Sequence, residues 1–327
     1  MKRPRGLLAL IAVTHAALSA LAALSAPAAE TTGTTLRFKL QPDQVLVYRT
    51  VSDIELEGRG AGERDTAHLD SEIHLEMVFS LTAGRRRPNG LTDVTIEILD
   101  VALTVEREWE RVRRRIEMNA QGIKIYDGKK LVQEGAWGDL QLPGGLDLRT
   151  LLDTPILAAM SDRAELKNLA NPDRVKRLLQ GANFVHLLRC QAVLPENPIS
   201  KGSTWQVEQP LVMANPIRLR QVYRAPGTET YTAVGALTHV KRRCLKVAIK
   251  GDWPKKDLGD GQAEGRSSAT AIVDFETGVT FALAVTSTHK IEGTIGNGEG
   301  DFESKSTSKT EYVGGRKTYE RYKAKNQ

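Results

Sequence analysis

The sequence predicts an α+β protein dominated by a large, curved antiparallel sheet with a half-barrel-like shape. Segments in which apolar and polar residues alternate follow one another with short turns between them, as in strands with one buried face. Helical periodicity appears in only one or two places, so the regular strand-helix alternation of a parallel sheet is absent. The β pattern is interrupted near Pro195, and we predict two pseudo-repeated halves that meet there.

The clearest strands have a strict period of two. Apolar residues occupy the odd positions from Ile73 to Leu81, and residues 279–285 alternate in the same way after a segment at 271–275. The turn between the last two segments contains Gly278, which suits the left-handed position of a hairpin turn. These segments predict neighbouring strands joined by a tight hairpin.

The apolar positions change parity at Leu99. Val94 and Ile96 lie on even positions, whereas Val101 and Leu103 lie on odd positions. A strand that continues through this point needs a β-bulge or a bend that re-aims its core face. Such a bulge is typical of a strongly curved sheet.

Two stretches read as helices. Asn171-Pro172-Asp173 has the cap, the first-turn proline and the acidic residue of a helix start, and apolar residues then recur at helical spacing, which predicts a helix near 172–188. Thr154-Pro155 can open a second helix near 155–169. The residues from 316 to 327 are highly charged, and we expect this tail to be disordered.

The first 28 residues have the features of a secretory signal peptide. Lys2, Arg3 and Arg5 precede an apolar run, and Ala26-Pro27-Ala28 has the small residues of a cleavage site. Cleavage would lower the formal net charge from +6 to +3, because the segment contains these three basic residues and no acid. We therefore expect a secreted or periplasmic protein with no transmembrane helix after cleavage, since no later stretch is apolar enough.

The segment from 194 to 207 predicts the link between the two halves. Pro195 and Pro198 fix their own φ angles and favour extended neighbours, which excludes a helix here. Gly202 lies in a turn, and Trp205 follows at the start of a new strand. We interpret Trp205 as a packing anchor rather than as a ligand-stacking residue.

The chain has two cysteines, Cys190 and Cys244. In an exported protein they either form one bridge or remain two thiols. Cys190 lies just past the predicted helix and Cys244 lies on the strand face opposite Leu245, so a helix that crosses the sheet would bring them together. We predict a disulfide between them with a structural role.

Patterns that carry catalysis or cofactor binding are absent from the sequence. There is no H-E-x-x-H, C-x-x-C or G-x-S-x-G motif, and the glycine-rich run at 293–300 does not join a strand to a helix. Glutamates at 108, 110 and 117 flank the arginines between 111 and 115, which indicates a solvated edge strand laced with ion pairs rather than a nucleic-acid interface. We therefore predict no catalytic residue, metal site or cofactor, and no nucleic acid as a partner.

The order of features resembles a group of uncharacterised secreted bacterial β-rich proteins. Residues 195–205 have the pattern P-x-x-P-I/V-x-x-G-x-x-W, and residues 274–278 have the pattern D-F-x-T-G. The long strands and the helix also look like the half-barrel of periplasmic lipoprotein carriers, in which a greasy concave face holds an acyl chain. This resemblance implies a fold, and it assigns no activity.

The sequence as a whole predicts four segments. These are a signal peptide (1–28), an N-terminal β-rich half (29–193), a C-terminal β-rich half (194–315) and a charged tail (316–327). We predict a non-enzymatic exported protein that binds a lipid, another hydrophobic ligand or another envelope protein. The alternatives are an envelope scaffold with a fully packed core and a hydrolase whose site is formed by residues far apart in the chain.

Overall fold

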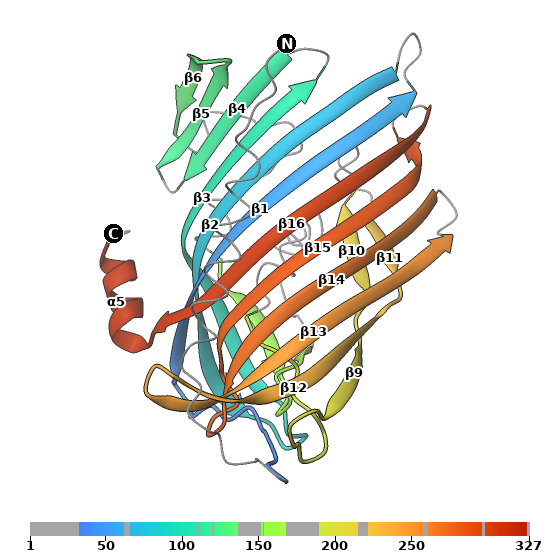
Figure 1. The fold of residues 1–327 in the computed structure, drawn as a ribbon. Helices are drawn as coiled ribbons and strands as arrows, with labels where there is room; N and C mark the ends of the chain where they lie inside the picture. The colour runs from blue at the N-terminus through green and yellow to red at the C-terminus, as the bar shows by residue number, and fades with distance from the viewer. Residues whose placement is uncertain are drawn as a thin grey trace.

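The computed structural model of the chain is an open, curved antiparallel sheet with a C-terminal helix on its convex face (Figure 1). It describes residues 33–61, 66–109, 112–119, 121–136, 152, 154–167, 190–214, 222–257, 261–295 and 298–325. The predicted signal peptide and the predicted helix near 172–188 lie outside the described residues. The predicted fold class, a large curved antiparallel sheet, is confirmed.

The strands fall into two groups along the chain. The first group is β1 (Val45–Ala61), β2 (Thr66–Arg86), β3 (Thr92–Trp109), β4 (Val112–Asn119), β5 (Gly122–Asp127), β6 (Lys130–Gly135), β7 (Ile156–Met160) and β8 (Leu166–Lys167). The second group is β9 (Thr204–Glu208), β10 (Leu211–Ala214), β11 (Val222–Ala225), β12 (Thr228–His239), β13 (Arg242–Asp257), β14 (Gly261–Asp274), β15 (Thr280–Ile295) and β16 (Gly298–Gly314). Helix α5 (Arg316–Lys325) follows β16.

Fourteen of these strands form one sheet, and β10 and β11 form a separate pair. The main path runs β6-β5-β4-β3-β2-β1-β16-β15-β14-β13-β12-β9, so the two groups of strands meet where β1 pairs with β16. The junction of the halves in space is therefore this central pair and not the segment at Pro195. The pseudo-repeat of the two halves stays a prediction.

The predicted bulge at Leu99 is confirmed. Val78 pairs with Asp100 and Phe79 pairs with Ile98, which leaves Leu99 as the extra residue on β3. Leu99 is buried on the convex face, where it clusters with Val45, Val47 and Val78. The bulge thus keeps the apolar residues before and after it on the concave face and turns one leucine outward.

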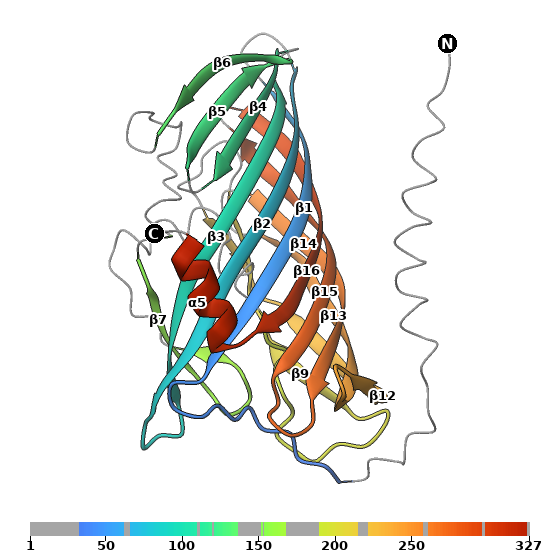
Figure 2. The same ribbon diagram turned by 90° about the vertical axis from the view of Figure 1, so that its left-hand side faces the viewer.

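The expectation of a disordered tail is wrong, because residues 316–325 form α5. The helix lies across β1 to β3 on the convex side (Figure 2), and Tyr319 and Tyr322 pack on the apolar cluster that contains Leu99. The Tyr319 hydroxyl donates to Glu97 Oε2 at 2.8 Å, and Lys323 Nζ lies 3.0 Å from Glu97 Oε1. Burial, together with the neighbouring Glu97 carboxylate, raises the pKa of Tyr319 to about 12. The tail sequence is dominated by charged residues, and the tail folds because the apolar cluster around Leu99 and the Glu97 carboxylate receive its tyrosines.

The helix expected near 155–169 is also wrong, because this region contains β7 and β8. β3 is much longer than β4 and pairs with it only from Ala102 onward, so its residues 92–96 have an open edge. β7 pairs with these residues and buries Ile156 and Met160 in the core. The apolar run of this segment is compatible with both helical and strand periodicity. Pairing with the free edge of β3 makes it a strand.

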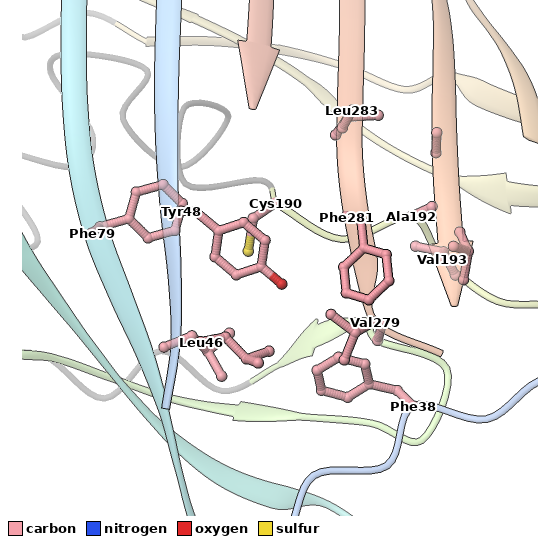
Figure 3. Packing of buried hydrophobic residues seen from close by; sticks show 14 of the residues in the cluster. Phe38, Leu46, Tyr48, Phe79, Cys190, Ala192, Val193, Val279, Phe281 and Leu283 are labelled. Carbon is pink, nitrogen blue, oxygen red and sulfur yellow. The ribbon is translucent and has the colours of Figure 1, made fainter. Parts of the chain in front are cut away.

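The main core joins side chains of both groups of strands. Tyr48 and Phe79 stack with ring centroids 5.7 Å apart, and Figure 3 shows Phe281 and Leu283 of β15 across from them. The buried segment 190–194, which we call the strap, packs between these strands. The strap therefore links the N-terminal and C-terminal strands at one end of the sheet.

Polar contacts hold the strap in place. Gln191 Nε2 donates to the Tyr48 hydroxyl at 2.6 Å, and Gln191 Oε1 accepts from the Thr280 backbone N–H at 2.9 Å. The Ala192 N–H donates to the Thr280 hydroxyl at 2.9 Å. Burial raises the pKa of Tyr48 well above its usual value, so the phenol stays neutral.

Gly278→Ala tests how closely the hairpin approaches the N-terminal segment. Gly278 has φ +68°, and a Cβ there would lie 2.5 Å from the Arg37 carbonyl oxygen. The matched control is Gly90→Ala, because Gly90 has φ +81° but no atom within 4 Å of its Cβ position. Both changes should cost about 1 to 2 kcal/mol for the left-handed backbone. Gly278→Ala should cost at least about 1 kcal/mol more in denaturant unfolding, and equal losses would contradict the close approach.

Glu97→Ala tests the docking of α5. The change removes the acceptor of both Tyr319 and Lys323 and should lower the free energy of unfolding by about 1 to 2 kcal/mol. Glu55→Ala is the control, because Glu55 is exposed on the same face of the sheet, and it should change stability by less than about 0.5 kcal/mol. Chemical denaturation of the two variants measures the difference.

Candidate functional site

The two faces of the sheet differ sharply in chemistry. On β1 the even positions, such as Thr50 and Ser52, face the concave side and are buried. The odd positions beyond the helix, such as Asp53, Glu55 and Glu57, are exposed on the convex side. The concave face is therefore the candidate site, since it is the sheltered surface of the molecule.

Ion pairs cross the convex face from strand to strand. Arg49 Nη2 lies 2.7 Å from Glu76 Oε2, and His74 Nδ1 lies 2.7 Å from Asp53 Oδ1. Further along the face, Lys255 pairs with Glu292 at 2.6 Å. Such cross-strand pairs are typical of a sheet surface in contact with water.

A continuous set of hydroxyl side chains crosses the centre of the concave face. The register places Thr50 beside Thr310, Ser52 beside Ser308, and Ser287 between Ser306 and Ser267. We call this set the hydroxyl band, and its members are Thr50, Ser52, Ser267, Ser287, Ser304, Ser306, Ser308 and Thr310. The band straddles the central pair β1–β16.

Several hydroxyls of the band hydrogen-bond to one another. Thr50 Oγ1 and Thr310 Oγ1 are 2.9 Å apart, and Ser287 Oγ and Ser306 Oγ are 2.7 Å apart. Ser52 Oγ donates to the Thr307 carbonyl oxygen at 3.3 Å. A hydroxyl both donates and accepts, so each pair keeps capacity for a further neutral polar group.

Bulky apolar residues border the band on both sides. Met77 and Leu103 lie on the N-terminal strands, and Ile249 lies on β13. Between them, the concave positions of β14 from 261 to 271 carry only small residues, namely Gly261, Ala263, Gly265, Ser267, Ala269 and Ala271. The concave face thus contains a strip of small, uncharged side chains bordered by bulky apolar ones.

Aromatic rings lie at the C-terminal side of this face. Trp205 stacks on Tyr231 with centroids 5.4 Å apart, and its Nε1–H donates to the Val193 carbonyl oxygen at 2.9 Å. The Tyr231 hydroxyl donates to the buried carboxylate of Glu229 at 2.8 Å. Trp205 therefore packs against the strap, in keeping with the anchor role that we assigned to it.

Trp253 covers a glycine pair nearby. A Cβ on Gly251 or Gly227 would lie 2.4 Å or 2.0 Å from the Trp253 ring, so both positions must stay without a side chain. The Trp253 Nε1–H donates to the Gln209 carbonyl oxygen at 2.7 Å. His289 packs against the edge of this ring, with centroids 5.9 Å apart.

The remaining residues that the sequence singled out lie at the strap end of the sheet. Gly202 has φ +85° and Gly278 has φ +68°, the left-handed region that both turns require. The Pro195 carbonyl oxygen accepts from Arg37 Nη1 at 3.0 Å. Pro198 precedes a bridge in which Ile199 and Thr34 exchange backbone hydrogen bonds. These residues secure the strap and do not line the hydroxyl band.

The predicted disulfide is not formed in the structure, where Cys190 and Cys244 are both free and buried. The Cys244 thiol lies 3.6 Å from the Arg242 carbonyl oxygen, and Gln191 Nε2 lies 3.6 Å from Cys190 Sγ. Burial raises the pKa of Cys190 to about 12 and that of Cys244 to about 11. Both thiols are core groups that stay protonated, because burial disfavours the charged thiolate.

Three of the described histidines lie in three different environments. His239 packs against Phe281 with centroids 6.1 Å apart, His289 contacts Trp253, and His74 is paired on the convex surface. Among the residues that the structure describes, no group of three or more His, Cys, Asp or Glu side chains is arranged to hold a metal ion. Within the same residues, no helix is long and apolar enough to cross a membrane.

Sequence reasoning missed the hydroxyl band. Its signal is the period-two occurrence of Ser304, Ser306, Ser308 and Thr310, which alone reads as the polar face of a strand. Only the pairing with β1 shows that this face is the concave one. The sequence therefore shows the alternating Ser and Thr residues, but it does not show which face of the sheet they occupy.

Comparisons with known proteins leave the family open. No family model matches the chain, and no curated protein matches it. Among solved structures, the translocator domain of the autotransporter NalP from Neisseria meningitidis is similar over 82% of this chain and 88% of that one, with 8% identity and a TM-score of 0.17. OccK5 (OpdH) of Pseudomonas aeruginosa covers 85% of this chain and 100% of its own, with 7% identity and a TM-score of 0.19. Likenesses at this level carry no argument about function.

The pKa of His74 should depend on Asp53. The hydrogen bond to Asp53 raises the pKa of His74 above its usual value. The pair therefore stabilises the fold below the unfolded-state pKa of about 6.5, and this contribution is lost as the pH rises through the folded-state pKa. NMR titration of the imidazole protons should show a lower pKa in Asp53→Asn, and an unchanged pKa in that variant would contradict the pairing.

Proposed function

We propose that the chain is a non-enzymatic exported protein of the cell envelope that binds an elongated hydrophobic molecule, such as the acyl chain of a lipid, on its concave face. The observation that carries this proposal is the separation of the two faces. The convex face is charged and ion-paired, whereas the concave face has apolar side chains on either side of an uncharged hydroxyl band. The predicted signal peptide supports export.

The composition of the concave face fits such a ligand. An acyl chain gains about 0.8 kcal/mol for each CH₂ group that it buries, and the apolar residues beside the band supply that contact. The paired hydroxyls, such as Ser287 and Ser306, can accept or donate one more hydrogen bond to an ester or hydroxyl group. The band itself contains no charged side chain, which favours a neutral segment of the ligand over a phosphate or a carboxylate.

The open sheet favours access to the half-buried part of the band, which is Ser267, Ser304, Ser306 and Ser308, whereas Thr50, Ser52 and Thr310 are buried. The main path of the sheet ends at β6 on one side and β9 on the other, so it does not close on itself. A long ligand can then lie along the strands without threading through a closed ring. The open edge is what distinguishes this arrangement from a fully enclosed core.

A scaffold with a packed core is the second candidate function. The strap favours it, because residues 190–194 are buried and pack between the two groups of strands at one end of the concave face. In that case the hydroxyl band would serve only to pair strands. The two candidates differ in whether the part of the band beyond the strap admits a ligand.

Ser267→Phe should block ligand binding, and Ser268→Phe is its matched control. The two serines are neighbours on β14, but Ser267 belongs to the concave hydroxyl band and Ser268 is exposed on the convex face. Binding of the fluorescent fatty acid cis-parinaric acid should weaken by at least about tenfold in Ser267→Phe, because a phenyl ring occupies the small-residue strip. The control should bind as the unchanged protein does.

Denaturant unfolding curves of both variants show whether each is still folded, so that lost binding is not mistaken for unfolding. Native mass spectrometry of the unchanged protein, purified from its own membrane fraction, gives an independent reading of a bound lipid. Bare protein in that spectrum, together with no binding of cis-parinaric acid, would favour the scaffold. Equal binding in the two phenylalanine variants would place the ligand elsewhere.

A further inference from the structure

The outward face of α5 is strongly basic. Arg316, Lys317, Arg321 and Lys325 are exposed on it, and Glu320 is the acidic residue among the exposed positions of the helix. Lys325 is paired with Asp100 at 3.2 Å. Lys317 and Arg321 have no ion pair among the described residues, so their charges are free to act outward.

Two more unpaired arginines lie at the same end of the sheet. Arg85 and Arg86 are exposed at the β2–β3 hairpin, and neither has an ion pair within the described part of the chain. Arg316 Nη2 donates to the Asp43 carbonyl oxygen at 2.9 Å, and the Asp43 N–H donates to the Ala83 carbonyl oxygen at 2.9 Å. These two bonds tie the start of α5 to the strand end that carries the arginines. Arg86 pairs with Thr92 and so shares the concave face with Val94. We therefore call the set Arg85, Arg316, Lys317 and Arg321 the basic platform.

The basic platform differs from strands β15 and β16 of the same face. Elsewhere on β15 and β16 the lysines have acidic partners, such as Lys290 with Glu303 at 3.4 Å and Lys309 with Glu311 at 2.7 Å. Unpaired like charges held close together repel one another and weaken the fold slightly. The exposed cations of α5 are therefore available to an anionic partner.

Exposed apolar side chains flank the helix on both sides. Val313 is 40% exposed at the end of β16, and Leu157 is 47% exposed on β7. Leu157 lies opposite Thr95, two residues from Glu97, which holds Tyr319 of the helix. These aliphatic groups border the helix on the sheet, whereas the cations of the helix lie outermost, about one helix diameter farther out.

We propose that this surface docks the protein on an anionic lipid bilayer. The helix lies on the convex side of the sheet (Figure 2), so its outward cations can meet lipid phosphates. A single-stranded nucleic acid is a poorer fit, because it needs aromatic faces for base stacking and the rings of Tyr319 and Tyr322 pack on the sheet. The site is separate from the concave face and does not depend on the function proposed for it.

Vesicle flotation with the full chain tests this docking. The unchanged protein should float with phosphatidylglycerol-rich vesicles, stay behind with vesicles of phosphatidylcholine alone, and lose binding as the salt concentration rises. The double variant K317E/R321E should bind the anionic vesicles at least about tenfold more weakly, since each basic residue near such a surface contributes about 1 kcal/mol.

The charge-matched control is K250E/K256E. Lys250 and Lys256 are exposed on β13, away from α5, and have no ion pair among the described residues. The control should keep vesicle binding, and equal losses in both double variants would show that only net charge matters and overturn the proposal. Failure of the unchanged protein to bind phosphatidylglycerol vesicles would also overturn it, as would binding to RNA without binding to vesicles.

Discussion

The pairing of β1 with β16 is the constraint on which the rest of the structure depends. It joins the first and last long strands of the described chain in the middle of the sheet, with Thr50 and Thr310 in contact across 260 positions of sequence. All other neighbours on the main path of the sheet, except β12 with β9, are consecutive strands joined by local connections. Without this one long-range pair, the sheet would fall into two separate meanders. Its formation requires the closure of a very long loop, which makes it the slow step expected of such a topology.

Both candidate surfaces of the molecule follow from that pair. The hydroxyl band is continuous only because the Ser and Thr residues of β16 come to lie between those of β1 and β15. On the opposite face, α5 follows β16 and lies on the convex side of β1, where Tyr319 and Tyr322 pack on the apolar cluster around Leu99. The concave surface proposed for a hydrophobic ligand and the convex surface proposed for an anionic bilayer thus share one structural origin.

The two surfaces also complement each other chemically. A protein that holds an acyl chain gains from proximity to a lipid surface, because the ligand then spends less time exposed to water. The basic platform lies at the end of the sheet where β1 begins and β16 ends, which is also the end that contains the strap.

The sequence by itself determined the class of fold, most strand positions and the bulge at Leu99, because each depends on the local alternation of apolar and polar residues. It also indicated the turns at Gly202 and Gly278, where only glycine takes the required backbone conformation without strain. What the tertiary structure alone decided depends on contacts far apart in the chain. The charged tail folds because Glu97 and an apolar patch receive it, and residues 156–160 form a strand because β3 has a free edge. Cys190 and Cys244 stay apart as free thiols, and the serines of β16 face inward, because long-range packing and strand pairing set both.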